Sequence, residues 1–314
     1  MKTVIPSRIS AVILLLVVVI LGCGSASTER PPATTPPGSA TVVETPQAAG
    51  GLALTMPNKG DSVKFAVLGD FGTGTREQYE LAGVMKQAHD LFKFDFVVLV
   101  GDNLYGSERP QDFKKKFEEP YKPLLDAGVK FYASLGNHDA REQRYYKLFN
   151  MDGKLYYSFK PDKQSVRFFA LESTYLDPEQ VAWFEKELQN SNSDWKIPYF
   201  HHPPYSSGDR HGSDTRLREV LEPLFLKYGV SVVLTGHDHF YERLKPQKGI
   251  VYFVTGSGGQ LRKGNIDKGS GLTAAGNDQD YAFMICEING DQMWFDAISR
   301  KGGVFDSGVI TRRK

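Results

Sequence analysis

Cysteine is almost absent from this sequence, with 2 residues in 314. Two cysteines cannot form the disulfide framework of a small secreted domain, and they are too few for a zinc site built from thiolates. A charge excess is also lacking, because 38 Lys and Arg oppose 37 Asp and Glu. A balance this close to neutral argues against a basic surface that binds nucleic acid. We therefore expect a fold held by core packing or by bound metal.

No apolar run of membrane-spanning length opens the chain. The run Ala11–Leu21 has eleven residues, too few to span a bilayer as a helix but suited to the core of a signal peptide. It leads into ILGC, which resembles the lipobox of a bacterial lipoprotein, with cleavage before Cys23 and lipid on its thiol. We therefore predict a signal peptide at 1–22 and an exported protein anchored through Cys23 to the cell envelope, on its periplasmic or extracellular face. The alternative is ordinary secretion with Cys23 unmodified.

Residues 23–60 are rich in Pro, Thr, Ala and Gly and have no hydrophobic period. This composition predicts a flexible tether between the lipid anchor and a domain. The remaining residues, 61–314, are enough for one sizeable domain with a large core. With Cys23 lipidated, Cys286 in the apolar run YAFMICEI is expected to be a small buried residue.

The domain alternates short β-branched or aromatic runs with helical segments, the pattern of an α/β protein. Helices are predicted at 75–90, 177–191 and 214–229, and a hairpin is predicted to turn at Pro161–Asp162. Alternating runs after residue 250 predict a second, mainly antiparallel sheet. We expect two mixed β-sheets that face each other with helices outside, a four-layer αββα sandwich.

Five of the apolar runs end in polar tips: GDFG, GDNLYG, GNHD, HHPPY and GHDH. Ligands of open α/β sheets bind beyond the carboxyl ends of strands, so tips that point the same way would converge. Their oxygen and nitrogen donors are too rich in imidazole for a magnesium or calcium cage and suffice for two transition-metal ions. The residues expected to converge are Asp70, Asp102, Tyr105, Asn137, His138, His202, His237 and His239.

These five blocks, in this order, resemble the motifs of calcineurin-like metallophosphoesterases, and specifically those of the purple acid phosphatases. The narrower resemblance depends on Tyr105, three residues after Asp102, and on Gly72, two residues after Asp70, where other relatives have histidine. It covers roughly Val63–Arg312. The small size and the lack of an added N-terminal β domain are similar to the single-domain branch of that family.

The resemblance implies two metal ions with seven protein ligands. The first ion is expected to be Fe(III), because a phenolate is a hard, anionic donor, and the second is expected to be Fe(II), Zn or Mn. The implied ligands are Asp70, Tyr105 and His239 for the first ion, Asn137, His202 and His237 for the second, and Asp102 as the bridge.

One ligand position requires a choice between neighbours. The block FHHPPY offers His201 and His202, and the family pattern places the ligand two residues before a proline. Pro204 selects His202 by this rule. His201, which has Pro203 nearby, stays open as the alternative.

The resemblance implies an acid phosphatase that acts on phosphorylated small molecules or phosphoproteins. A metal-bound hydroxide is expected to attack phosphorus, because two cations neutralise the phosphate and acidify a bound water. His138 and His211 match family positions near the phosphate and are the candidates for proton donor or phosphate ligand. The alternatives are an orienting role for His138 and a solvent-exposed loop position for His211.

Two other functions fit parts of the sequence. A phosphodiesterase of the same superfamily would use the same ligands on a different substrate. A noncatalytic surface lipoprotein would use the domain to bind metal, phosphate or a partner. The presence of every implied ligand favours an enzyme over such a binding protein.

Overall fold

The structure of the chain is a computed structural model that describes residues 40–44 and 52–314. The predicted signal peptide, Cys23 and most of the predicted tether lie outside the described residues. Within the described ranges, no helix is both long and apolar enough to cross a bilayer.

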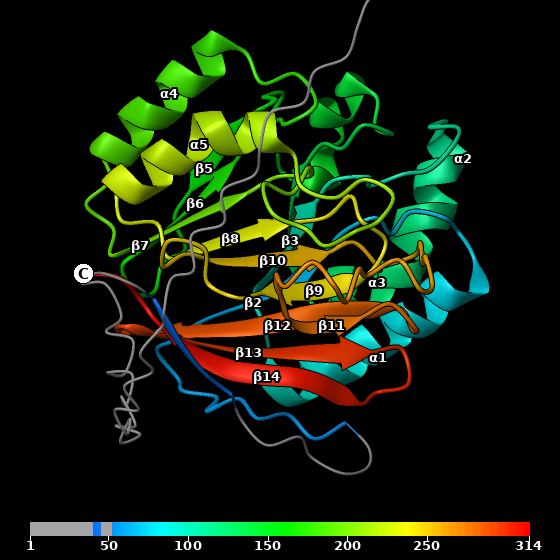
Figure 1. Cartoon of the computed structure of the whole chain (residues 1–314). Helices are drawn as coiled ribbons and strands as arrows, with labels where there is room; N and C mark the ends of the chain where they lie inside the picture. The colour runs from blue at the N-terminus through cyan, green and yellow to red at the C-terminus, as the bar shows by residue number, and fades with distance from the viewer. Residues whose placement is uncertain (1–39, 45–51) are drawn as a thin grey trace, which may run out of the picture. The chain divides into compact units, whose positions relative to one another are not determined.

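Two seven-stranded sheets form the centre of the domain (Figure 1). The strand order of the first sheet is β1 (Thr41–Glu44), β14 (Val304–Thr311), β13 (Gln292–Ser299), β12 (Ala282–Asn289), β2 (Val63–Leu68), β3 (Phe96–Val100) and β4 (Lys130–Ser134). The strand order of the second is β11 (Thr273–Asn277), β9 (Tyr241–Leu244), β10 (Val251–Thr255), β8 (Val232–Thr235), β7 (Trp195–Tyr199), β6 (Val166–Ala170) and β5 (Tyr157–Phe159).

Each sheet has a parallel part and an antiparallel part. Strands β2, β3 and β4 are parallel to one another, as are β6, β7, β8 and β10 in the other sheet. The tail strands divide between the sheets, because β12 and β13 extend the first sheet while β10 extends the second. The prediction of two mixed sheets is confirmed, and so is the hairpin of β5 and β6. The expectation that the tail forms a mainly antiparallel sheet of its own is wrong.

Helices cover the outer faces of both sheets (Figure 1). Helices α4 (Pro178–Gln189) and α5 (Thr215–Lys227) share a hydrophobic cluster with the second sheet, and α1 (Arg76–Phe92) and α3 (Glu119–Asp126) share one with the first. The predicted four-layer arrangement is therefore confirmed. The shorter elements are α2 (Pro110–Phe113), η1 (Lys114–Glu118), η2 (Arg141–Tyr145) and η3 (Lys147–Phe149).

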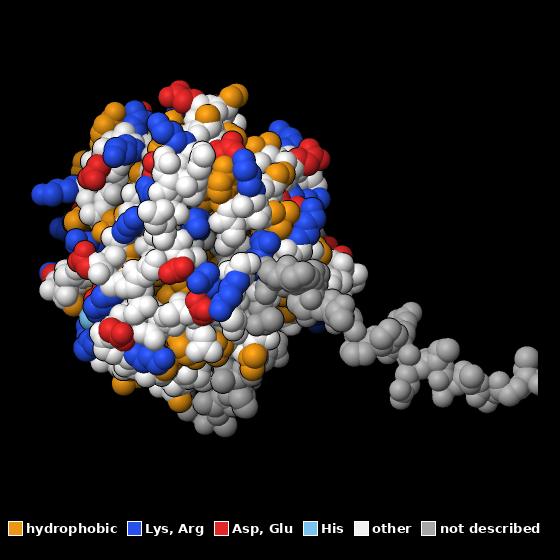
Figure 2. Space-filling model, turned by 90° about the vertical axis from the view of Figure 1, so that its left-hand side faces the viewer, with side chains coloured by type: hydrophobic (Ala, Val, Ile, Leu, Met, Phe, Trp, Pro, Cys, Tyr) orange, Lys and Arg blue, Asp and Glu red, His pale blue; other side chains and the backbone are white. Residues whose placement is uncertain are grey.

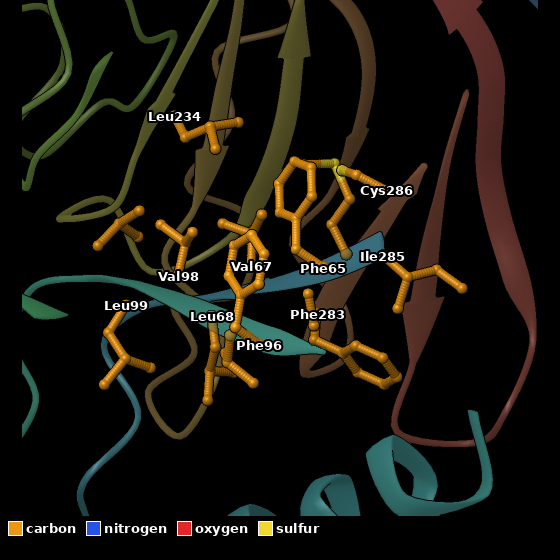
Figure 3. Packing of buried hydrophobic residues seen from close by; sticks show 14 of the residues in the cluster. Phe65, Val67, Leu68, Phe96, Val98, Leu99, Leu234, Phe283, Ile285 and Cys286 are labelled. Atoms are coloured by element: carbon orange, nitrogen blue, oxygen red, sulfur yellow. The ribbon is translucent and has the colours of Figure 1, made fainter. Parts of the chain in front are cut away.

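The main hydrophobic core lies between the two sheets. Phe65 of β2 meets Phe168 of β6 edge to face, with ring centroids 5.0 Å apart. Figure 3 shows Phe65 and Cys286 on the side of their strands that faces Leu234 of β8. Cys286 is a free thiol and is fully buried, as the sequence predicts. Packing of apolar faces thus fixes the distance between the two sheets.

Part of the predicted tether belongs to the fold. Thr41–Glu44 forms strand β1, which pairs antiparallel with β14. Nearer to β2, the backbone N–H groups of Thr55 and Lys59 donate to the buried carboxylates of Asp296 (2.7 Å) and Glu287 (2.6 Å). Buried carboxylates need such partners, and composition alone does not reveal the pairing. The prediction of a flexible tether is wrong for these residues.

Charges of both signs mix on the surface. Figure 2 shows Lys and Arg side chains interspersed with Asp and Glu over one face of the domain. One ion pair, Lys227 with Glu185 at 2.8 Å, joins α5 to α4. This pattern follows from the near-neutral composition.

Candidate metal centre

Loops that follow five parallel strands meet at one place. Asp70 follows β2, Asp102 follows β3, Asn137 follows β4, His201 follows β7, and His237 follows β8. Asp70, Asp102 and His237 have left-handed backbones, with φ of 55°, 49° and 72°. Residues other than glycine adopt this conformation at a cost, and such strain is concentrated at functional sites.

Glycines next to the loop tips allow the loops to approach closely. A Cβ atom at Gly136 would lie 2.2 Å from Oδ1 of Asp102, and one at Gly236 would lie 2.5 Å from Oδ2 of Asp70. Each carboxylate therefore packs against the bare backbone of another loop. This contact explains why GNHD and GHDH begin with glycine.

Tyr105 is at the centre of the first half of the cluster. Its Oη atom lies 3.1 Å from Oδ1 of Asp70, 2.9 Å from Oδ2 of Asp102 and 3.2 Å from Nε2 of His239. Nε2 of His239 is also 3.5 Å from Oδ1 of Asp70. The structure thus brings together the residues that the sequence assigns to the first ion, together with the proposed bridge.

His201 is at the centre of the second half. Its Nε2 atom lies 3.1 Å from Oδ1 of Asn137, 3.1 Å from Nδ1 of His237 and 3.4 Å from Oδ1 of Asp102. Its Nδ1 atom lies 3.0 Å from the carbonyl oxygen of Val100. A carbonyl only accepts, so the proton is on Nδ1 and the Nε2 lone pair faces the cluster.

His202 has a different environment. Its Nδ1 atom lies 2.9 Å from Oγ of Ser173, a hydroxyl that donates or accepts and so fixes neither tautomer. Nitrogen atoms of His201, His202 and His237 lie within 4.8 Å of one another, but His201 alone of these three also groups with Asp70 and Asp102. The structure therefore reverses the choice made from the sequence. His201 has the inner position, because its ring points at the shared carboxylate.

Among the described residues, no Lys or Arg forms an ion pair with Asp70 or Asp102. Burial, and then the neighbouring Asp102 charge, raises the pKa of Asp70 well above its usual range, and burial raises the pKa of Asp102. Their ion-pair contacts are to histidines, whose protonated forms burial disfavours. Burial lowers the pKa of His201 well below its usual value and that of His239 to about 4. Neutral imidazoles cannot balance two carboxylates.

This donor set fits metal cations. Carboxylate, amide and imidazole lone pairs converge around the two buried carboxylates of Asp70 and Asp102, and a bound cation supplies the positive charge that these carboxylates need. Burial and the charges of Asp70 and Asp102 raise the pKa of Tyr105, so its phenol keeps its proton without a cation. The residues present are therefore suited to hold the two ions that the sequence predicts.

Two further carboxylates hold the loops in place. Asp139 accepts hydrogen bonds from the backbone N–H groups of Asn103 (3.0 Å) and Gly136 (2.8 Å), which ties the loop after β3 to the loop after β4. Asp238 accepts from the Ser206 hydroxyl (2.5 Å) and ties the loop after β8 to the loop after β7. Both acids order backbone around the site.

His138 and His211 contact different residues of the cluster. The His138 backbone N–H donates to Oδ1 of Asp102 (2.9 Å), and its ring packs on Tyr105 with centroids 4.9 Å apart. The ring of His211 lies 4.3 Å from that of His237. Both residues are exposed, so a substrate can reach them.

Arg262 is a residue that the sequence motifs do not reveal. Its backbone N–H donates to the carbonyl oxygen of His239 (2.9 Å). Its Nη1 atom is buried and has no hydrogen-bond partner in the part of the chain that the structure describes. After burial, the Arg262 charge is the largest cause that lowers the pKa of His211 and of His239. The only sequence signal is its position just after the glycines of TGSGG, which pack on the loops of the site.

Comparisons with known proteins agree with this geometry. The family model of the calcineurin-like phosphoesterases matches residues 63–241. Purple acid phosphatase 17 of Arabidopsis thaliana is 29% identical over 249 residues, which cover 67% of this chain and 73% of that protein. Tartrate-resistant acid phosphatase type 5 of Homo sapiens is 26% identical over 251 residues, which cover 66% of this chain and 77% of that protein.

Solved structures share the fold. GAP50, the anchor in the inner membrane complex of Plasmodium, superposes with a TM-score of 0.70 at 22% identity, over 81% of this chain and 90% of that chain. The purple acid phosphatase PPD1 from yellow lupin superposes with a TM-score of 0.66 at 19% identity, over 82% of this chain and 55% of that chain. The predicted metallophosphoesterase fold is confirmed.

Proposed function

Because this chain belongs to the calcineurin-like phosphoesterase family, we propose that it is a phosphatase that hydrolyses phosphomonoesters at a pair of metal ions. The main support is the convergence of Tyr105 with the buried Asp70, Asp102 and His201, which come from three different loops. Similarity to purple acid phosphatases implies a dinuclear metal centre of this kind.

The two halves of the cluster are assigned to separate ions. We assign Fe(III) to the half that contains Tyr105, because a phenolate is a hard anionic donor, and Fe(II), Zn or Mn to the half that contains His201. When bound, the ions would neutralise the phosphate and lower the pKa of a coordinated water. The assigned ligands are Asp70, Tyr105 and His239 for the first ion, Asn137, His201 and His237 for the second, and Asp102 for both.

His138 and His211 are the residues placed to bind the phosphate or to protonate the leaving oxygen. They lie against Tyr105 and His237, one beside each half of the cluster. Asn at each position removes the acid and keeps a hydrogen-bonding group of similar size. If the substituted histidine is the proton donor, the loss of turnover is expected to grow as the leaving group becomes poorer. If it is a phosphate ligand, the loss is expected to be the same for all leaving groups.

Arg262 has a role in phosphate binding in this proposal. Its unpartnered Nη1 atom is a donor with a fixed charge, which suits a phosphate oxygen. Replacing Arg262 with Gln is expected to raise KM for a monoester by about tenfold, the loss of one charge-assisted hydrogen bond. An unchanged KM would remove Arg262 from the phosphate site.

Two nitrophenyl esters test the proposed activity. Metal-loaded protein is expected to hydrolyse p-nitrophenyl phosphate faster than bis(p-nitrophenyl) phosphate, and metal-free protein is the control. A strong preference for the diester would identify a phosphodiesterase instead. Retention of metal without hydrolysis of either ester would favour a noncatalytic domain that binds metal, phosphate or a partner.

The location of the protein is a separate proposal. The support is the sequence alone, since Ala11–Leu21 followed by ILGC is typical of a lipoprotein leader. Mass spectrometry of the mature N-terminus is expected to find lipid on Cys23 and a soluble exported form in Cys23→Ser. An unmodified Cys23 thiol in the mature protein would contradict this proposal.

A further inference from the structure

A trough leads away from the candidate metal centre toward the start of α5. Its inner part is a cavity of about 360 Å³, lined by His202, His211 and His237 among others. Its outer part, of about 270 Å³, lies against the residues between β6 and α4. Asp214 and Arg216 line both parts, so the two cavities adjoin each other.

Ser173 fixes the outer part relative to the centre. Its Oγ atom accepts from the backbone N–H of His202 (3.0 Å) and lies 2.9 Å from Nδ1 of the same residue. The next residues, Thr174 and Tyr175, donate their backbone N–H groups to the buried Glu172 carboxylate (2.7 and 3.0 Å). The wall of the trough is therefore held in a fixed position beside the imidazoles.

The far wall of the trough is apolar and open to solvent. Tyr175 is 64% exposed and Val220 is 42% exposed, and both line the outer part together with Leu176 and Leu217. Exposed large apolar side chains are few in the part of the chain that the structure describes, and two of them line this one cavity. Thr174 adds a buried Oγ1 atom that has no partner among the described residues.

The size and the charge of the trough limit what fits there. The outer part has the volume of about nine waters at ~30 Å³ each, which is large enough for one ring. Arg216 lies where the two parts meet, and the Arg141 guanidinium lies 5.8 Å from the centre of the Tyr175 ring. Guanidinium groups and an exposed tyrosine ring both favour the flat face of an aromatic group.

We propose that this trough is the leaving-group subsite and that it selects phosphomonoesters whose leaving group carries an aromatic ring. The inference rests on the proposed function, because it places the phosphate at the metal pair. The ring then lies over Tyr175 and Val220, which burial of apolar surface stabilises.

Two esters that differ in the ring test the inference. The substrates are 2-phenylethyl phosphate and propyl phosphate, which both release a primary alcohol, so the chemistry of the leaving oxygen is matched. The ring is expected to raise kcat/KM by about tenfold, the effect of burying part of its apolar surface. Tyr175→Ser and Val220→Ser are each expected to lower the ratio of kcat/KM for 2-phenylethyl phosphate to kcat/KM for propyl phosphate severalfold. Both variants should leave turnover of propyl phosphate unchanged.

The control variant is Leu91→Ser. Leu91 is 55% exposed on α1, outside the trough, and this variant is expected to keep the wild-type ratio. Circular dichroism of each variant verifies that it is folded.

Binding of 2-phenylethylphosphonate and propylphosphonate, measured by calorimetry, supplies a readout that does not depend on turnover. The subsite is supported if the wild type binds 2-phenylethylphosphonate about tenfold more tightly than propylphosphonate and if Tyr175→Ser and Val220→Ser each lower this affinity ratio. This support holds even if neither ester is hydrolysed, because a failure of hydrolysis would overturn only the proposed function. The subsite is overturned if the wild type shows equal kcat/KM for the two esters and equal affinity for the two phosphonates. It is also overturned if the two substitutions leave the ratios of kcat/KM and of affinity unchanged.

Discussion

Two groups of buried charge in this protein have opposite compositions. Asp306 of β14 faces the Arg243 guanidinium of β9 through two hydrogen bonds of 2.9 Å, and the Tyr241 hydroxyl also donates to it (2.7 Å). Acid and base balance each other there, and the pair joins the two sheets. Asp70 and Asp102 are also buried, but their side-chain partners are a phenol and neutral imidazoles. In the first group the acid is neutralised by a base of the same chain, whereas the donor set of the second group fits added cations.

The difference separates structural charge from functional charge. A buried carboxylate that is hydrogen-bonded to a guanidinium is already neutralised and does not need a bound cation. A buried carboxylate that faces lone pairs keeps a raised pKa, as Asp70 does, and this is the state that a metal ion reverses. Substitutions in the two groups should therefore have opposite consequences for activity and for stability.

The largest expected effect is on activity. Asp102→Asn keeps the size of the side chain but removes the negative charge between the proposed ions. We expect kcat/KM for p-nitrophenyl phosphate to fall by at least about 1,000-fold, or ~4 kcal/mol, with loss of bound metal. An enzyme that keeps a tenth of its activity would show that Asp102 is not a shared ligand.

The matching substitution in the other group is expected to change stability. Asp306→Asn removes the carboxylate from the buried Arg243 and should lower the free energy of unfolding by about 3 kcal/mol in urea titrations. Metal content and kcat of the folded protein should not change. A loss of metal in this variant would break the distinction between the two groups.

Neighbouring histidines sharpen the comparison within the site. His201→Ala is expected to weaken binding of the second ion by about 100-fold or more, whereas His202→Ala should weaken it by no more than about tenfold. The reason is that the His201 ring faces Asn137 and Asp102, and the His202 ring bonds Ser173. Calorimetric titration with zinc measures the affinity of each variant for the second ion. If His202→Ala weakened zinc binding more than His201→Ala does, His202 would be the ligand, as predicted from the sequence.

The smallest expected effect is on the pH dependence of the metal-free protein. Burial, followed by the Asp102 charge, raises the pKa of Asp139 to about 8. The folded state then holds a proton that the unfolded state releases near 3.8, so stability is lost as pH rises through 8. We expect a loss of about 1 kcal/mol between about pH 7 and pH 9, and a smaller loss in Asp102→Asn.

Chemical denaturation at each pH measures this loss, and metal-loaded protein is the control, since cations favour the ionised carboxylates. Stability that does not fall over this range would show that Asp139 is already ionised in the folded metal-free protein.

Local patterns were sufficient to predict the strands of the site and the main helices. Apolar runs that end in Gly-Asp, Gly-Asn or Gly-His form β2, β3, β4 and β8, because strand propensity and the need for bare backbone act within a few residues. The helix after Asp177 is equally local, since the Asp177 side chain caps it by accepting from the Gln180 N–H (2.8 Å).

Features that depend on distant partners could not be predicted in this way. The sequence offers His201 and His202 the same spacing to a proline, and contacts with distant residues such as Val100 and Asn137 decide which ring faces inward. Strand β1 and the ordered segment before β2 depend on pairing with β14 and on the buried acids Asp296 and Glu287. Arg262 lies in no motif at all. Each of these is a tertiary contact between residues far apart in the chain.

Metal analysis of the purified protein, combined with its visible absorption spectrum, tests the central claim most directly. We predict two ions per chain and an absorption band from the Tyr105 phenolate bound to iron, which Tyr105→Phe abolishes. Fewer than one ion per chain after loading with iron and zinc, or a metal content that Asp102→Asn leaves unchanged, would contradict it.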